Sequence, residues 1–122
     1  MSGERPLSGR RVLVVEDDYF LATDTCQWLT DAGAEVVGPT PDVEEACGLL
    51  DDERVDSAVI DINLGMGPTY EIARRLNRSQ VPFLFATGYD RSALPPQFQD
   101  NPHIEKPFQQ SDLVKAVSAL KC

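Results

Sequence analysis

The chain has 122 residues, 42% of them hydrophobic and 25% charged, a composition typical of a globular domain that buries a core without disulfides or a structural metal. A formal net charge of -9 argues against nucleic acid as a direct partner, because a phosphate backbone requires a basic face. No apolar run is long enough to span a bilayer, and the polar opening MSGERPLSGRR lacks the apolar stretch of a signal peptide, so we expect a cytoplasmic protein without a membrane partner.

Short apolar runs alternate along the chain with segments of helical periodicity, behind a flexible lead predicted over residues 1–10. In chain order, the predicted elements are a strand over 11–16 (RVLVVE), a helix that stops at Gly33, a strand over 35–39 (EVVGP), a helix capped by Asp42, a strand over 57–61 (SAVID), a helix over 69–78, a strand over 82–87 (PFLFAT), a strand over 103–107 (HIEKP) and a helix over 110–121. The strand cores are nearly continuous apolar runs, which is typical of strands covered by helices on both faces. We expect one domain over residues 11–122.

The segment GYDRSALPPQFQDNP, residues 88–102, interrupts this alternation. Pro95, Pro96 and Pro102 argue against a long regular helix, because proline lacks a backbone N–H and its ring clashes with the preceding turn. One helical turn and a loop are predicted in its place, so the fourth helix is short or irregular.

The three cysteines are odd in number and show no CxxC spacing, which indicates neither a disulfide framework nor a zinc site. Cys26 and Cys47 lie on the apolar faces of predicted helices, and we expect them to be small core residues. Cys122 is terminal and is expected to be a free thiol.

Strands that alternate with helices favour a doubly wound α/β fold, with a five-stranded parallel sheet and right-handed crossovers that place helices on both faces. In such sheets a site forms outside the carboxyl ends of the strands. Glu16 and Asp17 end the first predicted strand, Asp61 the third, Thr87 the fourth and Lys106 the fifth. Each alone has a structural explanation, such as a helix start, a turn or a solvated charge, but their convergence on one edge indicates a site.

The residue types at this edge suit a divalent cation and a phosphoryl group. Mg²⁺, or Mn²⁺ in its place, takes oxygen ligands, so the carboxylates of Glu16, Asp17 and Asp61 are predicted metal ligands. A carboxylate can attack phosphorus to give an acyl phosphate, which is the role predicted for Asp61. Lys106 would supply positive charge, and the Thr87 hydroxyl would donate to a phosphoryl oxygen.

VVEDD, an Asp that closes the third strand, a Thr that closes the fourth and Lys-Pro at the fifth resemble the receiver domain of two-component response regulators, over essentially residues 11–121. The resemblance implies a flavodoxin-like (βα)5 receiver fold. It also implies that Asp61 accepts a phosphoryl group from the phosphohistidine of a sensor histidine kinase or a histidine phosphotransfer protein. The protein would then be a signalling module rather than an enzyme, and a monomer or weak dimer.

Carried over residue by residue, the resemblance assigns further roles. Glu16 and Asp17 correspond to the acidic pair of the magnesium site, and Asn63 would offer its backbone carbonyl to the metal. Thr87 corresponds to the switch hydroxyl. Lys106-Pro107 corresponds to the invariant lysine and a cis peptide bond, for which proline is nearly required.

PFLFATGYD, residues 82–90, is similar to the Phe-Ala-Thr-Gly-hydrophobic-Tyr signature of the FAT GUY receivers. These are mostly single-domain regulators of alphaproteobacteria that often pair with HWE-type sensor kinases. Two residues depart from the pattern: Asp90 stands at the Tyr of the signature, and His103 stands where many receivers have an aromatic switch residue. We expect His103 to be a half-exposed strand residue rather than a phosphocarrier.

Two other classes of protein remain as alternatives. A haloacid-dehalogenase-like phosphatase also combines a strand-end Asp nucleophile with magnesium, but the second Asp that it requires two residues later is replaced here by Asn63. A flavodoxin-like cofactor binder would have a phosphate-cradling loop after the first strand, where EDDYF would repel a phosphate.

Overall fold

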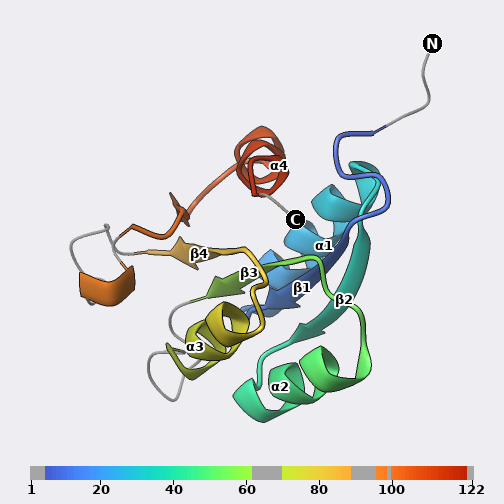
Figure 1. Cartoon of the computed structure of the whole chain (residues 1–122). Coiled ribbons are helices and arrows are strands. Elements are labelled where there is room, and N and C mark those ends of the chain that lie inside the picture. The colour runs from blue at the N-terminus through green and yellow to red at the C-terminus, as the bar shows by residue number, and fades with distance from the viewer. Residues whose placement is uncertain (1–4, 62–69, 89–95, 99, 121–122) are drawn as a thin grey trace.

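The computed structural model describes residues 5–61, 70–88, 96–98 and 100–120. Its elements, in chain order, are β1 (Arg11–Val15), α1 (Tyr19–Asp31), β2 (Glu35–Thr40), α2 (Val43–Asp52), β3 (Ser57–Asp61), α3 (Tyr70–Arg78), β4 (Phe83–Thr87), the 3-10 helix η2 (Pro96–Phe98), β5 (His103–Glu105) and α4 (Gln110–Ser118). The strands form one parallel sheet in the order β2-β1-β3-β4-β5, which confirms the predicted doubly wound α/β fold (Figure 1).

Helices cover both faces of the sheet (Figure 1). Successive residues of a strand point to opposite faces. Val12 and Val14 of β1 therefore join the core cluster of α1 and α4, while Leu13 and Val15 join the cluster of α2 and α3. Every residue of β3 and β4 is buried, which explains their continuous apolar runs. None of the helices within the described ranges is long and apolar enough to cross a membrane.

Local chemistry sets the helix boundaries that the sequence predicts. The carboxylate of Asp42 caps α2 by accepting from the N–H of Glu44 at 3.3 Å. Gly33 stops α1 with a φ of +101°, a left-handed conformation that favours glycine. Both predictions are confirmed.

Three elements end earlier than predicted, the first of them β1, which ends at Val15 rather than at residue 16. β5 ends at Glu105 rather than at residue 107, because Pro107 has no N–H to donate to a neighbouring strand. α4 ends at Ser118 rather than at residue 121, because the N–H of Leu120 donates to the carbonyl of Val117 in a tightened last turn.

The lead over residues 1–10 differs from the expected flexible segment in its described part, residues 5–10. Leu7 is fully buried against the α1–α4 side of the core, and its N–H donates to the carbonyl of Ala32 at 2.9 Å. The guanidinium of Arg10 donates to the carbonyl of Val117 at 3.0 Å. An isolated Leu in a polar stretch carries no periodic signal, so the sequence alone does not reveal this packing.

The described part of the proline-containing segment includes one short helical turn, as its sequence predicts. This turn is η2, and Phe98 within it is buried against Phe85 and Tyr70. Residues 89–95 and residue 99 lie outside the described part of the chain.

Cys26 and Cys47 are half-buried free thiols at the margin of the core rather than fully buried core residues. Cys26 packs against the core cluster on the α1–α4 side of the sheet. Burial raises the pKa of both thiols, which keeps them in the unreactive protonated form. Cys122 lies outside the described residues.

Candidate functional site

Four strands bring polar side chains to one edge of the sheet. Glu16 directly follows β1, Asp61 ends β3, Thr87 ends β4 and Lys106 directly follows β5. β3 lies between β1 and β4, and β4 pairs with β5, so the parallel order aligns these four positions along the same edge. Residues that are far apart in the sequence therefore become neighbours.

The side chains of Glu16, Asp17 and Asp61 form a cluster of three carboxylates, here called the carboxylate cluster. One ligand oxygen from each side chain lies within 4.8 Å of the other two. Glu16 and Asp61 are each only 6% exposed, whereas Asp17 is exposed. The backbone holds Glu16 in place: its N–H donates to the carbonyl of Thr40 at 3.0 Å, and its Oε2 accepts from the N–H of Asp18 at 3.1 Å. The sequence does not identify Thr40 as a support, because any residue there would offer the same carbonyl.

The carboxylate cluster fits a hard divalent cation. It offers only oxygen ligands, and oxygens that surround one Mg²⁺ at about 2.1 Å lie about 3–4 Å apart, so small side-chain movements suffice to close the site. Asn63, the further ligand predicted from the family resemblance, lies outside the described residues. The donor set also suits Mn²⁺, which prefers the same oxygen ligands.

Lys106 forms ion pairs with two of the three carboxylates. Its Nζ lies 3.0 Å from Oε1 of Glu16 and 3.2 Å from Oδ2 of Asp61. The side chain of Lys106 is 24% exposed, so the ammonium group stands at the mouth of the site rather than in the core. One positive charge is thereby shared between two buried carboxylates, which offsets part of their mutual repulsion.

Burial dominates the electrostatics of this edge. It raises the pKa of Glu16 from 4.5 to about 7, although the N–H of Asp18 and the ammonium of Lys106 act in the opposite direction. Burial on its own would lower the pKa of Lys106, but the hydrogen bond and charge of Glu16 and the charge of Asp61 outweigh it, and the pKa is raised. Lys106 is therefore positively charged at neutral pH, and Glu16 is easily protonated.

Thr87 is buried at the end of β4, next to the strand that carries Asp61. Asp61 pairs in register with Ala86, so Thr87 lies one residue further along the neighbouring strand. The carbonyl of Thr87 accepts from the N–H of Lys106 at 2.7 Å, which ties the ends of β4 and β5 together. The Lys106-Pro107 bond that follows is cis, as the resemblance implies.

His103 is half-buried in β5, as expected, and pairs in register with Phe85. Its Nδ1 is buried without a hydrogen-bond partner among the described residues. Tyr89 and Asp90, which carry part of the predicted signature, lie outside the described part of the chain.

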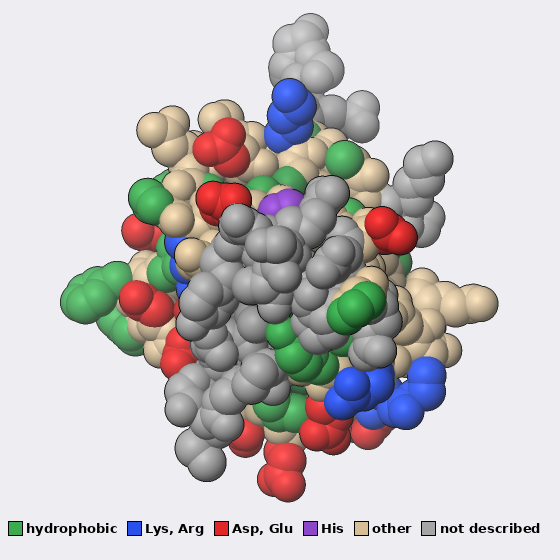
Figure 2. Space-filling model, turned by 90° about the vertical axis from the view of Figure 1, so that its left-hand side faces the viewer, with side chains coloured by type: hydrophobic (Ala, Val, Ile, Leu, Met, Phe, Trp, Pro, Cys, Tyr) green, Lys and Arg blue, Asp and Glu red, His purple; other side chains and the backbone are tan. Residues whose placement is uncertain are grey.

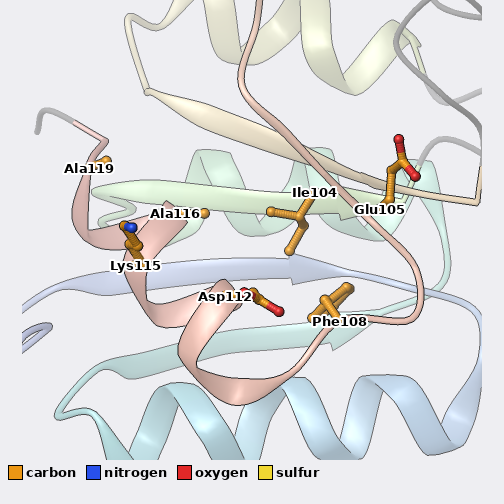
Figure 3. Close-up of a pocket in the computed structure, with 7 residues that line it drawn as sticks. All are labelled: Ile104, Glu105, Phe108, Asp112, Lys115, Ala116 and Ala119. Carbon is orange, nitrogen blue, oxygen red and sulfur yellow. The ribbon is translucent and has the colours of Figure 1, made fainter.

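The molecule also presents an apolar groove that contains none of the carboxylates of the cluster. It has a volume of about 460 Å³ and lies between β5 and α4, and Figure 3 shows Ile104, Phe108 and Ala116 among the residues that line it. Figure 2, which faces the side to which the strand arrows of Figure 1 point, shows acidic side chains distributed around that side and basic ones toward its margins.

The sequence and the structure of the chain are similar to those of known proteins. A family model described as the response regulator receiver domain matches residues 12–118. The sensory transduction protein LytT of Bacillus cereus is 35% identical over 116 residues, which cover 91% of this chain and 47% of LytT. The chain spans about half the length of the curated relatives it matches.

Two solved structures resemble the chain over nearly its whole length. The solution structure of SdrG from Sphingomonas melonis Fr1 has a TM-score of 0.80 and 31% identity, and covers 98% of each chain. The BeF3-activated conformation of SdrG from Pseudomonas melonis Fr1 has a TM-score of 0.79 and 28% identity, and covers 97% of this chain and 98% of the other. The region matched by the family model includes all three carboxylates, Thr87 and Lys106.

Proposed function

Because this chain belongs to the response regulator receiver domain family, whose members accept phosphoryl groups in two-component signalling, we propose that Asp61 is the residue that accepts the phosphoryl group here. The position of the Asp61 carboxylate supports this choice. Its Oδ2 lies 3.2 Å from Nζ of Lys106, and it belongs to the carboxylate cluster together with Glu16 and Asp17. A nucleophile at this point has a positive charge and other metal-binding oxygens as direct neighbours.

Asp61 acts as the nucleophile of a phosphoryl transfer. A carboxylate oxygen forms a bond to phosphorus while the P–N bond to the histidine of the donor breaks. The imidazole leaves with the electron pair of that bond and takes up a proton. The product is an acyl phosphate on Asp61, and its added negative charge stands beside the ammonium group of Lys106.

The side chains of Glu16, Asp17 and Asp61 would hold the divalent cation, and the family resemblance implies the backbone carbonyl of Asn63 as a further ligand. When bound, Mg²⁺ or Mn²⁺ supplies positive charge that offsets the charge of the transferred group. The Thr87 hydroxyl donates to a phosphoryl oxygen, and its burial at the strand end next to Asp61 supports this role.

The finer assignment is a receiver of the FAT GUY type. The signature PFLFATGYD and the similarity to SdrG, which is 31% identical, support it. The phosphoryl donor is then a sensor histidine kinase, of the HWE type, or a histidine phosphotransfer protein, and the protein works in the cytoplasm as a monomer or weak dimer. The family match favours this signalling function over a phosphatase of the haloacid dehalogenase type.

The substitution Asp61→Asn tests the proposal, because the amide keeps the shape of the side chain and loses the nucleophile. We expect wild type to acquire an acid-stable, base-labile label from acetyl phosphate in the presence of Mg²⁺, and the variant to acquire none. Chelation of the metal should stop labelling of wild type, and wild type should not turn over a generic phosphomonoester. A folded variant that is labelled at the wild-type rate contradicts the assignment of Asp61.

A further inference from the structure

The pairing of β1 with β2, the edge strand beside it, contains a β-bulge next to the carboxylate cluster (Figure 1). Leu13 of β1 lies opposite Val37 of β2, and the next pair in register is Val15 with Thr40. Between these two pairs β1 has one residue and β2 has two. A bulge bends its strand, re-aims the side chains around it and is common beside active sites.

Pro39 explains why the regular register does not continue. The N–H of Glu35 donates to the carbonyl of Arg10 at 2.8 Å, and the residues of β2 that face β1 in this way recur at every second position. The series reaches position 39, where proline has no N–H to donate. The extra residue of the bulge moves Thr40, which has an N–H, into the place that Pro39 would otherwise take.

Gly38 allows the bulge to form. Its φ is +92°, a left-handed conformation that favours glycine. A Cβ atom at this position would lie 3.1 Å from the carbonyl oxygen of Val14 and 3.1 Å from the backbone nitrogen of Thr40. A side chain at residue 38 would therefore strain the backbone and push Thr40 away from β1.

The bulge determines which backbone group holds Glu16. The carbonyl of Thr40 accepts from the N–H of Glu16 at 3.0 Å, directly after the end of β1. Thr40 is fully buried, and its hydroxyl accepts at 3.1 Å from the N–H of Asp42, the residue that caps α2. The backbone of Glu16 is therefore fixed by an anchor that is itself tied to the start of α2.

We propose that Gly38 and Thr40 are positioning residues of the phosphoryl-accepting site, an inference that rests on the cation site of the proposed function. Through the bulge they set the place of the Glu16 backbone, and with it the place of the Glu16 and Asp17 carboxylates that would hold the cation. Gly38 has no side chain and the Thr40 carbonyl accepts from Glu16, so both residues act through Glu16. Groups that hold a metal ligand in place contribute about 10–100-fold to metal affinity.

Gly33 provides a matched control for Gly38. Its φ is +101°, and a Cβ atom there would lie 2.9 Å from Cβ of Arg5 and 3.0 Å from Cα of Ser8. An alanine at either position therefore meets a left-handed backbone and a close steric contact. Gly33 precedes the start of β2, so it lies at the opposite end of the parallel sheet from the carboxylate cluster.

The test compares Gly38→Ala with Gly33→Ala in the full chain. Both variants should lose stability in urea unfolding with chelator. Gly38→Ala should raise the Kd for Mg²⁺, measured by calorimetric titration, by about 10-fold or more, whereas Gly33→Ala should stay within about twofold of wild type.

Hydrogen exchange in chelator supplies a second readout that does not involve the metal. The N–H of Glu16 should exchange about 10-fold faster in Gly38→Ala than in Gly33→Ala, compared at urea concentrations at which the two variants are equally stable. A Gly38→Ala variant with the wild-type Kd for Mg²⁺ overturns the inference. An equal rise of the Kd in both variants also overturns it, because the rise would then report lost stability rather than a displaced ligand.

If either glycine variant does not fold, Thr40→Val decides, because it keeps the shape of the side chain and removes the hydroxyl that accepts from Asp42. It should raise the Kd for Mg²⁺ by about threefold, the effect of one hydrogen bond. Thr40→Ser keeps the hydroxyl and should restore the wild-type Kd. A wild-type Kd in Thr40→Val, or a rise that persists in Thr40→Ser, overturns the inference.

Labelling of wild type by acetyl phosphate separates the positioning role from the acceptor role of Asp61. If Asp61 is not labelled but Gly38→Ala alone weakens Mg²⁺ binding, the positioning role stands and the acceptor role fails. If Asp61 is labelled and Gly38→Ala binds Mg²⁺ like wild type, the acceptor role stands and the positioning role fails. A wild-type protein that does not bind Mg²⁺ overturns the positioning role, because no cation would then depend on the place of Glu16.

Discussion

Glu16 is almost fully buried beside Asp61 and Lys106, and burial raises its pKa from 4.5 to about 7. In the unfolded chain the same carboxyl is in water and ionises at its ordinary pKa. The native state therefore binds this proton more tightly than the unfolded state does. The stability that Glu16 contributes is fully present below about pH 4.5 and is lost as the pH rises through about 7.

Glu16→Gln should remove this pH-dependent loss, because an amide cannot ionise. One pKa unit corresponds to about 1.4 kcal/mol, so we expect the metal-free variant to be more stable than wild type by about 1–3 kcal/mol above pH 7, with the gap closing toward pH 4.5. Urea unfolding in chelator at several pH values measures the difference. Addition of Mg²⁺ is the control, since it should stabilise wild type more than the variant. A constant gap across this pH range contradicts the prediction.

Asp17 differs from Glu16 because its carboxylate is exposed while it belongs to the same group of oxygens. Asp17→Ala should raise the Kd for Mg²⁺ by about 10-fold or more, because one predicted ligand is lost. It should leave the metal-free protein at least as stable as wild type, since a like charge is removed from the cluster. Calorimetric titration with Mg²⁺ and urea unfolding in chelator test the two parts. A variant that is clearly less stable without metal argues against repulsion within the cluster.

At the scale of elements, an aromatic contact joins α3 and η2, the helices that follow β3 and β4 in the described part of the chain. Asp61 at the end of β3 is followed along the chain by α3, which begins at Tyr70, and Thr87 at the end of β4 is followed by η2, which ends at Phe98. The rings of Tyr70 and Phe98 stack with centroids 5.3 Å apart, and Phe98 also packs edge to face on Phe85 of β4. The far ends of the two connections, from β3 to α3 and from β4 to η2, are therefore fixed to the core, and their near ends begin at the phosphoryl-accepting site.

Residues 88–102 are predicted to be the segment that responds to phosphorylation. Its prolines limit regular hydrogen bonding, so its amides should exchange faster than those of the neighbouring strands in the metal-free state. Beryllofluoride at Asp61 mimics the phosphoryl group, and the Thr87 hydroxyl should move toward it. Because the segment begins directly after Thr87, this movement should order the segment and slow the exchange of its amides. Hydrogen exchange with and without beryllofluoride measures the change. Asp61→Asn is the control and should show none, and equal protection of wild type in both states contradicts the prediction.

At the scale of the whole molecule, the described part of the lead joins the two helices on one face of the sheet. Leu7 belongs to the core cluster that contains Leu29 of α1 and Leu113 of α4. Its N–H donates to the carbonyl of Ala32, the residue that follows α1, and the guanidinium of Arg10 donates to carbonyls at and just after the end of α4. The lead therefore closes the end of the domain opposite to the phosphoryl-accepting edge.

Leu7→Ala should lower the free energy of unfolding by about 2–4 kcal/mol, the cost of a cavity at a fully buried leucine. Ser8→Ala is the control, because Ser8 is exposed and its replacement should change stability by no more than about 0.5 kcal/mol. Chemical denaturation of the full chain measures both. A Leu7→Ala variant as stable as the Ser8→Ala variant shows that the lead does not contribute to the core.

Local sequence pattern determined much of this protein. Continuous apolar runs identified the strands, and Asp42 and Gly33 identified helix boundaries, because periodicity, capping and glycine conformation act over a few residues. Alternation of strands with helices determined the parallel sheet. A parallel sheet places every strand's carboxyl end on the same edge, so the polar residues at the ends of separate strands could be grouped from the sequence.

Only the tertiary structure decided the surroundings of each member of the group. Glu16 is buried and Asp17 is exposed although the two are adjacent, and Lys106 pairs with Glu16 and Asp61 from a different strand. The burial of Leu7 and the exposure of Tyr19 and Phe20 were likewise invisible in the sequence. Burial and ion-pair distances depend on contacts between residues that are distant along the chain, whereas sequence patterns report only on near neighbours.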